Sequence, residues 1–178
     1  MCSGPSMPEQ PSAHDRAVAG FVARFGAAPG VVVRSPGRVN LIGDHTDYMA
    51  GLAMPMAINL STTVEGSPGG SSVELRSSSE PAPAYFDLPA TDPGGIRPDW
   101  ARYPAAVALE MQCVSGFRGT VSSEVPLGAG LSSSAALEVA VALALGAEVP
   151  KDPAGALDLA RLCQRAEHRA VGVPCGLM

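Results

Sequence analysis

Residues 126–140 read PLGAGLSSSAALEVA, a glycine- and serine-rich segment that passes directly into alanine, leucine and glutamate. Gly128 and Gly130 allow the backbone to adopt positive φ and to approach an anion closely. Residues 135–145 contain no proline or glycine and consist mainly of strong helix formers. The unpaired N–H groups and the positive dipole end at the start of such a helix attract phosphate. The segment therefore predicts a phosphate-binding loop followed by a helix.

Three consecutive serines, Ser132, Ser133 and Ser134, stand where this helix is expected to begin, and we expect them to cap it. The loop is not a Walker P-loop, because that motif needs a Gly-Lys-Ser/Thr step and the only lysine of the chain is the distant Lys151. Taken alone, the segment is equally compatible with a surface turn that precedes an ordinary buried helix. A second motif is needed to choose between the two interpretations.

A second polar segment comes earlier, at residues 35–48, which read SPGRVNLIGDHTDY and follow a strand-like run of three valines. Loops at the ends of strands commonly carry binding and catalytic groups, because a rigid scaffold positions them. Arg38 offers a planar fork of donors for phosphate oxygens, and Asp44, His45 and Asp47 are suited to hydrogen-bonding several hydroxyls of a polyol. A solvated loop is the alternative, but the two segments together favour a sugar-phosphate site.

Three ordered segments carry a resemblance to one family. GRVNLIGDHTDY at 37–48 resembles the galactokinase signature, and AEHRAVGVPCGLM at 166–178 resembles the galactokinase segment that leads into the catalytic aspartate. PLGAGLSSSA at 126–135 resembles the nucleotide-binding motif of the wider galactokinase, homoserine kinase, mevalonate kinase and phosphomevalonate kinase (GHMP) superfamily. The resemblance spans residues 31–178 and implies an ATP-dependent sugar kinase.

The coarse order of elements predicts an α+β fold. Strands followed by helices, without strict alternation, favour packed layers, and the resemblance implies the N-terminal domain of the GHMP kinase fold, which is similar to domain 2 of ribosomal protein S5. We expect a disordered tail over residues 1–13 and a sugar- and ATP-binding domain over 14–178, without the family's C-terminal domain. The expected helices cover 13–25, 100–113, 135–145 and 157–170, and the expected strands begin at Val31 and cover 52–65, 72–77 and 117–125, with a looser proline-rich segment at 80–98.

The resemblance also implies roles for individual residues. Arg38 would stabilise charge on the transferred phosphoryl group, and Ser134 and Glu167 would supply oxygen ligands to Mg²⁺. Galactose would be held by Asp44, His45, Thr46, Asp47 and, through its backbone, Gly176. ATP would be bound by Gly128, Ala129, Gly130, Leu131, Ser132, Ser133 and Ser134, with Trp100 and Tyr103 near the adenine.

Some of these residues have a simpler interpretation. Glu167 lies in an amphipathic run, so a solvated helix face is the alternative to a metal ligand. Trp100 and Tyr103, three residues apart, are also compatible with core packing. The family usually has glutamate where this chain has Asp44. The hydrogen bond to a sugar hydroxyl must then be lost, bridged by water or recovered by a backbone shift.

The end of the sequence bears on activity. In galactokinases the segment resembling residues 175–178 continues directly into Asp-Gln, and that aspartate takes the proton from the anomeric hydroxyl of the sugar. A positioned general base is worth about 10² to 10⁴ in rate. We therefore expect the 178 residues alone to be inactive or severely impaired. The alternatives are a non-catalytic sugar and ATP sensor and an N-acetylgalactosamine kinase, which usually has isoleucine in place of Thr46.

Composition excludes several classes of function. The chain has 46% hydrophobic and 16% charged residues, a mean hydropathy of +0.17 and a net charge of −5. These values are typical of a globular protein, and the scattered arginines favour no nucleic-acid surface. The N-terminus does not resemble a signal peptide, and the longest apolar helical run, at 139–147, is far short of the roughly 20 residues that cross a bilayer. Four cysteines without CxxC spacing indicate free thiols. We expect a cytoplasmic protein that acts as a monomer when complete.

Overall fold

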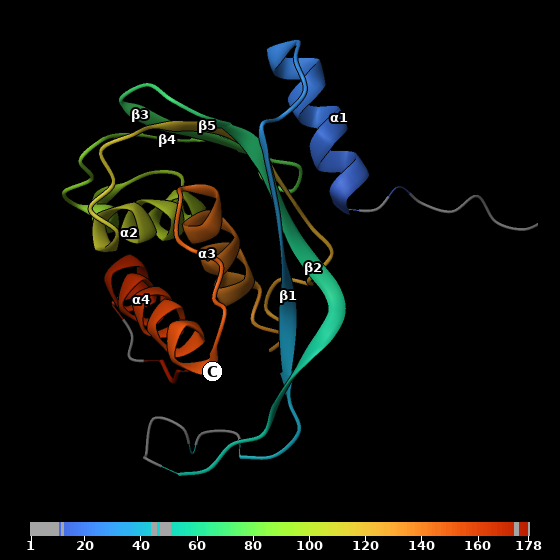
Figure 1. Ribbon diagram of the computed structural model, residues 1–178, viewed down its shortest axis with the longest axis vertical. Coiled ribbons are helices and arrows are strands. Elements are labelled where there is room, and N and C mark those ends of the chain that lie inside the picture. The colour runs from blue at the N-terminus through green and yellow to red at the C-terminus, as the bar shows by residue number, and fades with distance from the viewer. Residues whose placement is uncertain (1–10, 12, 44–45, 47–50, 173–174, 178) are drawn as a thin grey trace, which may run out of the picture.

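The computed structural model describes residues 11, 13–43, 46, 51–172 and 175–177, and they form a mixed five-stranded sheet with helices on both faces (Figure 1). The spatial order of the strands is β1 (Val31–Asn40), β2 (Pro55–Pro68), β5 (Phe117–Ser123), β3 (Ser72–Ser77) and β4 (Ala84–Asp87). Neighbouring strands are antiparallel except β3 and β5, which run parallel. The predicted α+β class is confirmed.

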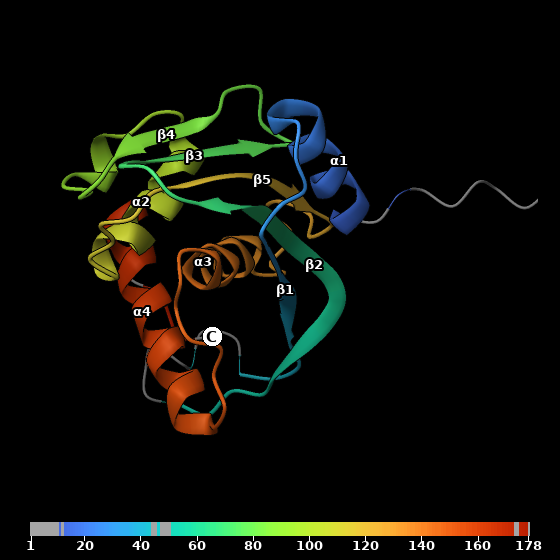
Figure 2. The ribbon, with the colours of Figure 1, turned by 45° about the horizontal axis from the view of Figure 1, so that its top comes forward.

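Helices from different parts of the chain cover the two faces of the sheet (Figure 2). Helix α1 (Ala13–Phe25) packs on β2 and β5 from one side. On the other side lie α2 (Arg102–Glu110), α3 (Ser133–Ala144) and α4 (Pro153–Val171), and α3 contacts β1 and β2. Two short 3₁₀ helices, η2 (Pro93–Gly95) and η3 (Asp99–Ala101), precede α2. Of the helices described, none combines the length and apolarity needed to cross a bilayer.

Helix α3 lies at the centre of the core. Most of its buried positions are alanines, including Ala136, Ala140 and Ala142, and such small side chains let neighbouring helices approach closely. It contacts both α2 and α4 as well as the sheet. This packing places the first turn of α3 beside the middle of β1, where the candidate site lies.

Both ends of helix α4 are marked by residues that favour a helix terminus. The Asp152 side chain accepts a hydrogen bond from the Gly155 N–H over 2.8 Å, and Pro153 occupies the first turn, where a missing N–H costs nothing. Gly172 ends the helix with φ +70°. The helix therefore begins four residues before the predicted start at 157, because its cap and proline lie outside the amphipathic run.

Two parts of the predicted architecture need correction. Strand β1 extends to Asn40, so residues 35–40 are extended rather than part of a loop. It is an edge strand, which tolerates Pro36, and its pairing register with β2 shifts between Pro36 and Arg38. Strand β4 was not predicted, since it is short and lies within the proline-rich segment 80–98. The predicted tail lies almost entirely outside the described residues.

Candidate active site

The loop between β5 and α3 requires glycine at two positions. Gly128 and Gly130 have φ of +71° and +72°, a conformation that glycine adopts without steric cost. No heavy atom lies within 4 Å of a Cβ placed at either residue, so the backbone conformation, and not lack of space, calls for glycine. Residues 126–130 are exposed. The loop thus presents its backbone to solvent at the start of α3.

The first turn of α3 carries no side-chain cap. Ser132, at the N-cap position, has a left-handed backbone (φ +56°, ψ +48°) and makes no capping hydrogen bond. The expected serine capping is therefore wrong: the Ser134 hydroxyl instead donates to Glu167, and Ser132 lines the main cavity. Because the first N–H groups of a helix have no partner within it, those of α3 are left for an anion.

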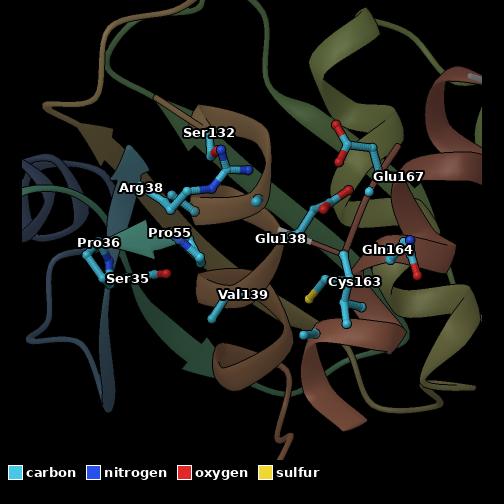
Figure 3. Close-up of a pocket in the computed structure, with 15 residues that line it drawn as sticks. Ser35, Pro36, Arg38, Pro55, Ser132, Glu138, Val139, Cys163, Gln164 and Glu167 are labelled. Carbon is cyan, nitrogen blue, oxygen red and sulfur yellow. The ribbon is translucent and has the colours of Figure 1, made fainter. Parts of the chain in front are cut away.

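A cavity of about 250 Å³ lies between β1, α3 and α4 (Figure 3). It is the main cavity of the candidate site because both motifs border it, although pockets beside α1 and at residues 147–162 have larger volumes. Arg38 reaches it from β1, and its Nε atom is buried without a hydrogen-bond partner. The Arg38 backbone N–H donates to the Leu131 carbonyl of the glycine loop over 3.0 Å. The two polar motifs, far apart in the sequence, therefore meet through a backbone contact at the edge of one cavity.

Glu167 joins α4 to the start of α3. Its Oε1 accepts a hydrogen bond from the Ser134 hydroxyl over 2.8 Å, and its side chain lines the main cavity. The exposed side chains Arg165 and Arg169 lie on a different face of α4, where both pair with Glu110 of α2. Glu167 thus faces α3, as a metal ligand shared with Ser134 would require.

Sequence reasoning missed Glu138, a second acid of this cavity. Its side chain is 1% exposed, and Oε1 has no hydrogen-bond partner. Burial, and secondly the Glu167 carboxylate, raise the pKa of Glu138 to about 9. A signal was present in the sequence: Glu138 is the only charged residue in the apolar run 135–145, and it follows Ser134 by four residues, which places both on one face of α3.

Glu138 and Glu167 also raise the pKa values of three neighbouring side chains. Burial, and then Glu138 and Glu167, raise the pKa of Cys163 to about 12. Burial, and then chiefly Glu167, raise the pKa of Cys175 to about 12. The pKa of the Tyr103 hydroxyl is raised by burial first and by the same two acids next. Both thiols therefore stay protonated at neutral pH.

The two aromatic residues predicted to lie near the adenine, Trp100 and Tyr103, occupy different surroundings. Trp100 lines a small cavity of about 90 Å³ together with Leu127 and Ser133 of the phosphate loop, and its indole N–H donates to the Ala82 carbonyl over 3.0 Å. Tyr103 does not line this cavity, and both aromatics are half-buried against the hydrophobic core. Trp100 thus combines a core contact with a place beside the loop.

The predicted sugar-binding segment lies mostly beyond what the structure describes. Asp44, His45 and Asp47 fall outside the described residues. The Thr46 hydroxyl lies 2.7 Å from the carbonyl oxygens of both Gly43 and Leu52 and can donate to either, and its backbone N–H donates to Gly43 over 3.2 Å. In this structure Thr46 therefore holds together the backbone of the connection between β1 and β2.

Residues 175–177 return to α4 and are held by it. The Cys175 N–H donates to Nε2 of His168 over 2.9 Å, and the Cys175 carbonyl accepts from the Gln164 amide over 3.0 Å. Gly176, predicted to line the sugar pocket, lines the main cavity. Two side chains of α4 thus fix the backbone at this wall.

The donors at the cavity suit a hard divalent cation. Glu167 and Glu138, whose Oε1 has no partner, line the cavity, and the Ser134 hydroxyl lies behind Glu167, to which it is hydrogen-bonded. Within the described part of the chain, no group of three or more His, Cys, Asp or Glu side chains could hold a metal by itself. A cation here needs phosphate oxygens and water to complete its shell, which is the usual situation of Mg²⁺.

Comparisons with known proteins place both motifs in one family. Residues 19–68 match the galactokinase galactose-binding signature, and residues 102–178 match the GHMP kinases N terminal domain. Galactokinase of Bos taurus is 45% identical over 184 residues, which cover 96% of this chain and 46% of that protein. The crystal structure of Lactococcus lactis galactokinase complexed with galactose matches with a TM-score of 0.76 at 30% identity, over 90% of this chain and 43% of that one.

The fold is shared more widely. The mevalonate kinase of Methanococcus jannaschii matches with a TM-score of 0.67 at 20% identity, over 83% of this chain and 49% of that one. The chain spans less than half the length of the curated relatives it matches.

Proposed function

The chain belongs to the galactokinase family of the GHMP kinase superfamily, and on this basis we propose that the protein transfers the γ-phosphate of ATP to the anomeric hydroxyl of galactose, giving galactose 1-phosphate. The observation that carries the proposal is the position of Arg38. Its backbone is hydrogen-bonded to the phosphate loop, while its side chain lines the cavity that Glu167 also lines. The support is that a guanidinium, the start of a helix and a carboxylate all border one cavity, as binding of a phosphate with its Mg²⁺ would require.

The proposed roles follow from the physics of phosphoryl transfer, in which the protein mainly aligns the reactants and neutralises charge. The glycine loop and the uncapped amides of α3 bind the phosphates of ATP, and Trp100 borders the adenine. Mg²⁺, held by Ser134 and Glu167, would neutralise phosphate charge. The Arg38 guanidinium stabilises the charge that develops on the transferred group.

The sugar site is proposed to comprise Asp44, His45, Thr46 and Asp47 together with the backbone of Gly176. The support is the family signature over residues 19–68 and the galactose in the complex of the Lactococcus lactis relative. The proton of the sugar hydroxyl must pass to a base, and we assign that role to no described residue. The inactivity expected for the 178 residues alone stays a prediction. Three free cysteines, Cys113, Cys163 and Cys175, fit a reducing cytoplasm.

A coupled ADP-release assay on the full-length gene product tests the proposal. We expect turnover with galactose, ATP and Mg²⁺, and a loss of at least about 100-fold in kcat for Arg38→Ala. Arg34→Ala is the matched control, because Arg34 lies on the same strand but hydrogen-bonds Ser61 on β2, outside the cavity. Absence of turnover in the unsubstituted protein, or equal kcat for the two variants, would contradict the proposal. Galactose binding without turnover would indicate a sensor, and preference for N-acetylgalactosamine the alternative kinase.

A further inference from the structure

Glu138 has no partner that explains its place in the core. Its side chain is 1% exposed, Oε1 makes no hydrogen bond, and no ion pair involves it within the described residues. A buried carboxyl without a partner destabilises the fold. Such a residue is expected where a bound ligand provides the missing interaction.

The other buried acid among the described residues provides a contrast. Glu65 on β2 is 0% exposed and lies on the other side of the sheet. Its carboxyl oxygens also lack a hydrogen bond of good geometry, but Nδ1 of His14 from α1 is 2.8 Å from Oε1. Glu65 therefore has a basic neighbour within the fold. Glu138 instead borders the main cavity, which a second acid, Glu167, also lines.

A cation is the ligand that this arrangement lacks. Arg38 lines the same cavity but forms no ion pair with either acid within the described residues. Figure 3 shows the carboxyl groups of Glu138 and Glu167 directed toward the same region, from α3 and α4 respectively. Two carboxyl groups on neighbouring helices offer the oxygen ligands that a hard divalent cation prefers, and the thiols of Cys163 and Cys175 beside them stay protonated at neutral pH.

We propose that Glu138 is the third protein group of the cation site: its carboxylate contacts the divalent cation that accompanies ATP, or one of the waters bound to that cation, together with Ser134 and Glu167. This inference rests on the proposed function, since it assumes that a nucleotide brings the cation into the cavity. It adds a positioning residue to the pair that the family resemblance implies. The cation in turn compensates the carboxylate that the empty fold leaves without a partner.

Calorimetric titration of Mg²⁺ into the full-length gene product, saturated with a non-hydrolysable ATP analogue, tests the inference without measuring turnover. Glu138→Gln keeps the size of the side chain and removes its charge. We expect it to weaken cation affinity about 10- to 100-fold, as is usual when a group that orients metal ligands is removed, and to leave galactose affinity unchanged. Glu65→Gln, the matched buried acid outside the cavity, should leave cation affinity unchanged.

The outcomes separate this inference from the proposed function. If the unsubstituted protein binds neither the nucleotide analogue nor the cation, both are overturned. If it binds both and Glu138→Gln has the same cation affinity, only the role of Glu138 is overturned. Should the variant fail to fold, a crystal structure of the unsubstituted protein with Mn²⁺ and the analogue gives the answer. Mn²⁺ located with Glu138 touching neither the ion nor its waters would refute the inference.

Discussion

Replacing Gly37 by alanine tests whether the contact between β1 and the phosphate loop positions Arg38. A Cβ at residue 37 would lie 2.9 Å from the Leu131 carbonyl oxygen and 3.0 and 3.1 Å from the two methyl groups of Val125. Real Cβ atoms essentially never approach closer than 3.0 Å, so the backbone of the loop must move. Gly37 does not have positive φ. The effect of the substitution therefore arises from lack of space and not from backbone strain.

The expected cost has two contributions. Overpacking of a tight contact destabilises a protein by about 1–3 kcal/mol. Moving Leu131 also weakens its hydrogen bond from the Arg38 N–H, now 3.0 Å long, and such a bond contributes about 0.5–1.5 kcal/mol. We therefore expect a loss of about 2–4 kcal/mol in the free energy of unfolding. In a domain of this size each kcal/mol lowers Tm by about 2–4 °C.

The functional consequence is specific to the nucleotide. A displaced Leu131 carries the start of α3 away from Arg38, so ATP affinity and kcat should both fall, which calorimetry and the coupled assay measure on the full-length gene product. Gly30→Ala is the control, because its nearest atoms, Ser67 Oγ and the Gly66 carbonyl, are 3.9 and 4.0 Å away. If Gly37→Ala melts at the temperature of the unsubstituted protein and binds ATP equally well, the contact does not position the loop.

Three further substitutions probe the site and its supports. The folded-state pKa of Glu138, about 9, lies above its ordinary value of 4.5, so the folded protein holds this proton more tightly. That stabilisation is complete below pH 4.5 and is lost as the pH rises through 9. In metal-free buffer the stability of Glu138→Gln relative to the unsubstituted protein should therefore increase between these limits, by at most about 1.4 kcal/mol per pH unit. Denaturant unfolding at several pH values measures this, and a difference in the free energy of unfolding that does not change with pH would contradict it. His168→Leu removes the acceptor of the Cys175 N–H and should raise the KM for galactose, whereas His168→Gln, which keeps an acceptor, should largely restore it; equal KM values for the two variants would be the opposite result. Asp152→Ala removes the cap of α4 and should cost about 1 kcal/mol in denaturant unfolding, while Asp158→Ala, exposed on the same helix, should cost almost nothing.

Local signals predict the elements whose ends are marked in the sequence. Helix α1 and strand β3 have the predicted bounds. The helix stops at Gly26 and the strand begins after Gly69 and Gly70, all with positive φ. Such punctuation acts within a few residues, so a single sequence reveals it. The loop-to-helix transition at 126–140 is predictable for the same reason.

Contacts between distant elements set the features that the sequence did not predict. The run 135–145 correctly indicates a buried helix, but nothing in it shows that Glu167 of α4 lies opposite Glu138. The serines at the start of α3 are of a residue type that commonly caps helices. The Ser134 hydroxyl is instead taken by Glu167, which stands 33 residues later in the chain. Propensity indicates what a side chain can do, and tertiary packing selects one of its options.

The Pro36–Gly37 pair illustrates how such packing directs a functional side chain. Ser35 and Arg38 both line the main cavity, although residues three apart in a regular strand face opposite sides of the sheet. The pairing of β1 with β2 is irregular at this point. Pro36 pairs with Ser61 and Arg38 with Ala57, so one residue of β1 lies opposite three residues of β2. Proline and glycine, which predict a turn, here lie in an edge strand at this irregularity, where strict alternation no longer holds. A guanidinium carried by a sheet needs less reorganisation during phosphoryl transfer than one on a loop, so this irregular pairing contributes to the proposed site.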